Sequence, residues 1–75
     1  MQYGPDPPEE LLNIWPNIER LRRERGLTAA TVAERSGIPY PSSWYRKMNS
    51  PRLLRGDEFE AIAAVLGVHI GELFQ

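Results

Sequence analysis

The sequence predicts an all-helical (all-α) domain, and three observations support this prediction. Apolar side chains recur at helical spacing in residues 14–21 and again in residues 59–66. Glycines follow periodic segments at positions 26, 37 and 67, where a glycine commonly ends a helix. No segment shows the alternation of apolar and polar residues that is typical of a strand.

A chain of 75 residues makes one domain with a thin core. It has no cysteine, so closely packed helices have to supply the stability that disulfides or a cysteine-based metal site would give. No apolar run approaches the roughly 20 residues that a membrane span requires, and a signal peptide is not evident. We therefore expect a cytoplasmic protein with an N-terminal extension (1–15) and a helical domain (16–75).

Capping residues and prolines mark the first helices. The start motif Asp-Pro-Pro-Glu predicts a short helix over residues 7–13 of the extension. Pro16 disfavours helical geometry in the residue before it and suits a first helical turn, so we expect the next helix over 16–25. The Thr28 hydroxyl is expected to cap a helix that ends at Gly37.

The following segments complete the helical pattern. A helix is expected over about 41–48, joined so tightly to its predecessor that the two predict a helix-turn-helix motif, with Ile38 reaching the core from the turn. The loop 52–56 leads to a helix over 57–66, for which Asp57 and Glu60 match a capping box. A last short helix is expected around residues 70–74.

Positive charge is unevenly distributed, although the formal net charge is −1. Three of the ten acidic residues lie in the first ten positions, so the rest of the chain carries nine bases and seven acids. Between Arg35 and Gly56 there are five bases and no acid. This basic stripe is what binding to phosphates requires, whereas chance clustering on a solvated surface is the simpler alternative.

Four stretches of the chain occur in a characteristic order: IERLRRERGLT (18–28), VAERSGI (32–38), EAIAAVLGV (60–68) and ELF (72–74). In this order and spacing they resemble the Cro/repressor-type (XRE-like) helix-turn-helix DNA-binding family, over about residues 17–74. The resemblance implies a lambda-repressor-like five-helix domain. Its second helix would cross the phosphate backbone and its third would enter the major groove, usually as a dimer on a two-fold site.

The third helix of the resemblance, residues 41–48, carries side chains suited to base edges. Arginine and lysine donate to guanine, and asparagine or serine can pair with other bases. The expected base contacts are Ser42, Ser43, Arg46, Lys47 and Asn49. The expected phosphate contacts are Thr28, Arg35, Tyr45, Arg52 and Arg55. Helix capping alone is enough to explain a threonine at position 28, and exposure to solvent alone is enough to explain an arginine at position 35.

Two departures from the family pattern affect this site. Ala29 stands where the family commonly has a glutamine that braces the second helix on DNA, so we expect one contact to be lost. The turn 38–44 is one residue longer than usual, which leaves open whether Trp44 or Tyr45 is buried. We favour a buried Trp44, because Met48 lies four residues further along the same face, and a partly exposed Tyr45.

Apolar residues at the two ends of the chain have two interpretations. They cover the open side of a small core, or they form a dimer or partner surface. These residues are Leu11, Leu12, Trp15, Leu73 and Phe74. His69 is a lone imidazole in a chain without cysteine, so we expect no metal and no cofactor.

Together these features predict sequence-specific binding to double-stranded DNA by a homodimeric transcriptional regulator, such as a Cro-like phage or prophage repressor. One alternative is an antitoxin that represses its own operon. Another is a protein-interaction module that has lost DNA binding, which Ala29 and the net negative charge would suit. An enzyme is the least supported class, because the sequence shows no nucleophile–base pair and no paired acids; no small-molecule ligand is evident.

Overall fold

Helix α2 (Ile14–Glu24) begins the part of the chain that the computed structural model describes, residues 13–75. The helix starts two residues earlier than expected, so Pro16 occupies its third position. Proline is tolerated there because the N–H groups of a first turn have no partner within the helix. The expected helix over 7–13 falls almost entirely outside the described residues, as do Leu11 and Leu12.

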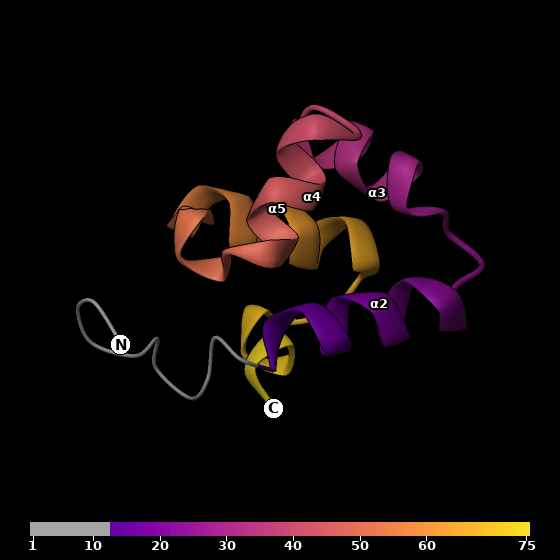
Figure 1. Ribbon diagram of the computed structural model, residues 1–75. Coiled ribbons are helices and arrows are strands. Elements are labelled where there is room, and N and C mark those ends of the chain that lie inside the picture. The colour runs from indigo at the N-terminus through magenta and orange to yellow at the C-terminus, as the bar shows by residue number, and fades with distance from the viewer. Residues whose placement is uncertain (1–12) are drawn as a thin grey trace.

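Helices α3 (Ala29–Ser36) and α4 (Ser42–Asn49) form the predicted helix-turn-helix pair. Thr28 caps α3 as expected, since its Oγ1 accepts a hydrogen bond of 3.1 Å from the Thr31 amide. Gly37 ends α3 with a φ of 77°, in the left-handed region that favours glycine. The chain then passes through a short connection to α4 (Figure 1).

A 3₁₀ turn, η1 (Pro51–Leu53), connects α4 to α5 (Gly56–Leu66). Helix α5 begins one residue earlier than expected, and the predicted cap of Asp57 with Glu60 is wrong. The Glu58 carboxylate instead accepts a hydrogen bond of 2.9 Å from the Arg55 amide. The last element, η2 (Ile70–Phe74), is the predicted short helix in 3₁₀ form.

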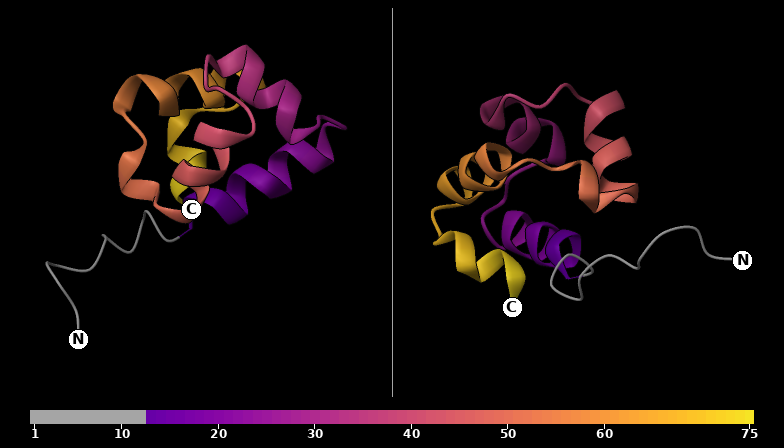
Figure 2. Two further views of the ribbon diagram at one scale, coloured as in Figure 1. Left: turned by 45° about the horizontal axis from the view of Figure 1, so that its top comes forward. Right: turned by 90° about the vertical axis from the view of Figure 1, so that its left-hand side faces the viewer.

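The core lies where these elements meet. Helix α3 packs against α5, and η2 packs against both α2 and α5. As a result α3 and α4 lie on one side of the molecule, with η2 and the C-terminus on the other (Figures 1 and 2). Ile38 is buried, as predicted, and Trp44 is fully buried while Tyr45 is 41% exposed, which confirms the favoured register of α4.

Trp15 and Leu73 are core residues, so the alternative that they form a dimer or partner surface is wrong for both. The Trp15 indole meets Trp44 edge to face, with ring centroids 4.7 Å apart, and its Nε1 donates to the Lys47 carbonyl at 2.9 Å. Ile14 and Trp15 thus belong to the core helix α2, not to an extension. Phe74 is half-buried beside Phe59, at 5.4 Å between centroids.

Asn17 is a buried polar residue that the sequence analysis missed. Its Nδ2 donates to the carbonyl oxygens of Leu73 at 2.9 Å and of Gln75. The hydrogen bonds tie the first turn of α2 to the last residues of the chain. They also satisfy an amide that would be costly to bury without partners.

The described residues form four α-helices and two 3₁₀ helices, and no strand occurs among them. The all-α prediction is therefore confirmed. Within the same residues, no helix has the length and apolar character needed to cross a membrane.

Candidate nucleic-acid interface

Helix α4 has an exposed face and a buried face, and both follow from helical spacing. Ser42, Tyr45, Arg46 and Asn49 are exposed at positions i, i+3, i+4 and i+7. On the opposite side, Trp44 lies in the core and Met48 packs against it. The buried side holds the helix in one orientation, so the exposed side is presented to whatever approaches.

Arg46 lies within this exposed face, which we call the α4 face (Ser42, Tyr45, Arg46 and Asn49). Its guanidinium forms no ion pair or hydrogen bond within residues 13–75. A planar guanidinium can donate two parallel hydrogen bonds to guanine, and the amide of Asn49 can pair in the same bidentate way with adenine. The face therefore combines two groups that can discriminate between bases.

Lys47 is not part of the α4 face, so the structure does not favour its prediction as a base contact. The side chain is 14% exposed, and its Nζ lies 2.9 Å from both carboxylate oxygens of Glu58. The same Nζ donates to the Leu53 carbonyl at 3.3 Å. Spacing could have indicated this, since Lys47 follows the buried Trp44 by three positions and so lies toward the core. Ser43 is half-buried and lies at the edge of the exposed face.

Glu58 has a lowered pKa in spite of its burial. Burial by itself raises the pKa, but the hydrogen bonds from Lys47 and from the Arg55 amide, with the positive charge of Lys47, lower it by more. The Glu58 carboxylate is therefore charged at neutral pH, and it pairs with Lys47 between α4 and α5.

Tyr40 adds a second aromatic ring beside the α4 face, which the sequence analysis did not predict. Its ring centroid lies 5.6 Å from that of Tyr45, and the two hydroxyl oxygens are 3.2 Å apart. This hydrogen bond raises the pKa of Tyr40, so its hydroxyl stays protonated at neutral pH. Nothing in a five-residue separation across an irregular turn indicates such a pair beforehand.

The expected phosphate contacts lie before and after α4. Arg35, in the last turn of α3, is exposed and has no ion pair within the part of the chain that the structure describes. Arg52 is exposed on η1. Arg55 is paired with Asp57 at 2.9 Å, but both side chains are about two-thirds exposed or more, so a phosphate can replace the carboxylate at little cost. The hydroxyl of Thr28 is engaged in capping α3 and in a hydrogen bond to Thr31.

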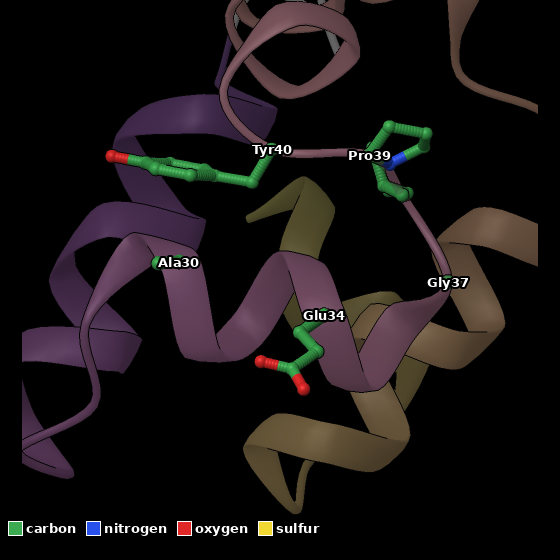
Figure 3. A pocket seen from close by; sticks show the side chains of 6 residues that line it. Ala30, Glu34, Gly37, Pro39 and Tyr40 are labelled. Carbon is green, nitrogen blue, oxygen red and sulfur yellow. The ribbon is translucent and has the colours of Figure 1, made fainter.

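A pocket of about 470 Å³ lies beside α3 and the segment that follows it (Figure 3). Ala30 and Glu34 of α3 line it together with Gly37, Ile38, Pro39 and Tyr40. The carboxylate of Glu34 would repel a phosphate, so the pocket is not suited to hold one. Among residues 13–75 there is no group of three or more histidine, cysteine or acidic side chains that could hold a metal ion.

Comparison with known proteins agrees with the architecture. A helix-turn-helix domain family matches residues 18–74, a range that contains all of α3, α4 and α5. No curated protein and no solved structure matches the chain. Since the match covers most of the sequence and includes the paired helices described above, this chain belongs to the helix-turn-helix domain family, a kind of DNA-binding protein.

Proposed function

We propose that the domain is a transcriptional regulator that binds double-stranded DNA sequence-specifically by placing α4 in the major groove. The observation that carries this proposal is the α4 face: Arg46 and Asn49 are exposed, while Trp44 and Met48 anchor the other side of the helix. The major groove is about 12 Å wide and admits one α-helix. Ser42 and Ser43, at the N-terminal end of α4, would approach bases or the neighbouring phosphate.

Arginines outside α4 would position the helix without reading sequence. Arg35 on α3, and Arg52 and Arg55 on the segment between α4 and α5, are the groups that we assign to phosphates. Tyr45 can add a hydroxyl contact, whereas the Thr28 hydroxyl would have to release its hydrogen bond to Thr31 before it could donate to a phosphate. Contacts with the backbone of DNA supply much of the affinity and make it dependent on salt.

We further propose that the regulator acts as a homodimer on a two-fold operator, in the manner of a Cro-like repressor of a phage or prophage. An α4 of eight residues exposes few groups to base edges, so one copy discriminates among few base pairs. Two copies related by a two-fold axis would double the number of bases read, with their α4 helices about 34 Å apart.

Selection of bound duplexes from a random-sequence pool tests this function. We expect enrichment of a motif with two inverted half-sites centred about 10 base pairs apart. A mobility-shift titration should then show tighter binding to the selected site than to a scrambled duplex, and the mass of the complex should correspond to two chains. Equal binding to every sequence, or no binding at low salt, would exclude the proposed function.

A further inference from the structure

The side chain and backbone of Lys47 join three elements around α4. Its Nζ lies 2.9 Å from both oxygens of Glu58 in the first turn of α5, and 3.3 Å from the Leu53 carbonyl of η1. Its own carbonyl accepts the hydrogen bond of Trp15 from α2. The C-terminal half of α4 is therefore connected to α2 on one side and to α5 on the other.

The partner of Lys47 also holds the segment between α4 and α5. Glu58 accepts a hydrogen bond from the Arg55 amide at 2.9 Å in addition to the bonds from Lys47. Together these contacts fix both ends of residues 53–55, next to Arg52, within the loop that carries two of the arginines assigned to phosphates. The Lys47 and Glu58 side chains are only 14% and 12% exposed, so solvent screens the ion pair little.

We propose that Lys47 and Glu58 form a specificity-determining positioning pair: they fix the loop that bears Arg52 and Arg55 relative to α4. Contacts with bases discriminate only if the phosphate contacts place the helix in one register on the duplex. A loop that moves relative to α4 could still bind phosphates while α4 occupies several positions in the groove. The pair thus determines sequence preference although neither residue touches DNA. This inference rests on the function proposed above.

A double-mutant cycle with Lys47→Met and Glu58→Gln tests the pair. The measured quantity is the ratio of affinities for the selected site and for a scrambled duplex. Each single variant is expected to lower this ratio roughly tenfold, and the double variant no further, because either change breaks the same interaction. Affinity for the scrambled duplex should stay at the wild-type value, since no phosphate contact is removed. Glu60→Gln makes the same charge change on an exposed part of α5 and should leave the ratio unchanged.

Three outcomes would contradict the proposals, and they differ from one another. If Lys47 contacts DNA directly, Lys47→Met weakens binding to both duplexes, whereas Glu58→Gln frees the lysine and does not. If the pair serves stability alone, both variants unfold at a lower temperature but keep the wild-type ratio when measured fully folded. If the wild type itself prefers no sequence, the proposed function fails first. Glu58→Gln retains an oxygen that can accept from the Arg55 amide, so it carries the test even if Lys47→Met does not fold.

Discussion

At the scale of single residues, the arginines discussed above occur in two places. Arg46 lies on the α4 face, and the others lie on the segments around it. Arg46 is exposed on the helix itself and has no partner within residues 13–75. Arg55 lies on the loop before α5 and is paired with a solvent-exposed aspartate. The two side chains have the same chemistry, so their positions alone should give them different roles.

Replacing Arg46 by alanine should relax sequence preference. We expect Arg46→Ala to cost about 1–3 kcal/mol of binding free energy at the selected site, with the loss concentrated at one base pair of each half-site. Titrations against a set of singly substituted operators measure this. A uniform loss at every substituted operator would show that Arg46 contacts phosphate instead.

Replacing Arg55 by alanine should weaken binding to all sequences alike. Removal of one phosphate contact is expected to reduce the slope of log K against log salt by about one. The exposed ion pair with Asp57 contributes little to stability, so the melting temperature should stay close to that of the wild type. Arg46→Ala is the matched comparison, and identical behaviour of the two variants would contradict both assignments.

At the scale of elements, side-chain contacts at the N-terminal ends of α3 and α5 help to hold these two helices. The Thr28 hydroxyl makes one of these contacts, because it accepts a hydrogen bond from the third residue of α3. We expect Thr28→Ala to lower the free energy of unfolding by about 1 kcal/mol, as measured by urea denaturation. Thr28→Ser keeps the hydroxyl and should retain most of the stability; an equal loss in both variants would argue against the cap.

The ion pair between α4 and α5 predicts a dependence of stability on pH. The folded pKa of Glu58 lies below its unfolded value, so its ionised form stabilises the fold above the unfolded pKa. This contribution is lost as pH falls through the lower, folded pKa. Below about pH 4 the free energy of unfolding should therefore fall more steeply for the wild type than for Glu58→Gln. Parallel curves for the two proteins would show that the pair adds no net stability.

Most helices of this fold could be predicted from the sequence, because apolar spacing, Thr28 and the glycines at 37 and 67 act locally. The start of α5 could not be predicted, since Asp57 and Glu58 both suit the first turn of a helix. The contact with Lys47 favours Glu58 as the residue that accepts from the Arg55 amide. The α4 face was largely predicted from its own residues. The spacing of Lys47 from Trp44 could have indicated that it lies off this face, but its partner Glu58, eleven positions away, could not be predicted. Asn17 was missed because its acceptors are at the far end of the chain.

At the scale of the whole molecule, the core is small enough that one side chain decides whether it forms. Trp44 is fully buried and contacts Trp15 from α2, while its neighbour Tyr45 is exposed. The free energy of unfolding of a protein is usually about 0.05–0.15 kcal/mol per residue, so a domain of this size is stable by only a small margin. The fold and the orientation of α4 therefore depend on the same residue.

Truncation of Trp44 should destabilise the domain far more than truncation of Tyr45. We expect Trp44→Ala to cost about 3–5 kcal/mol, which leaves a large fraction of chains unfolded at room temperature. Tyr45→Ala is the adjacent control and should change the free energy of unfolding by less than about 1 kcal/mol. Urea denaturation followed by circular dichroism compares them. Similar losses would mean that α4 is rotated from the orientation described.

The edge-to-face pair of Trp15 and Trp44 can serve as an intrinsic spectroscopic probe of the structure. These are the protein's two tryptophans, so every indole chromophore in the chain lies at the junction between α2 and α4, the helix that we assign to the groove. Because the rings are 4.7 Å apart, we expect their electronic transitions to couple and to produce a paired band in the circular dichroism spectrum. That band reports whether α4 is seated on α2, without any attached dye, in the free protein and during a titration with DNA.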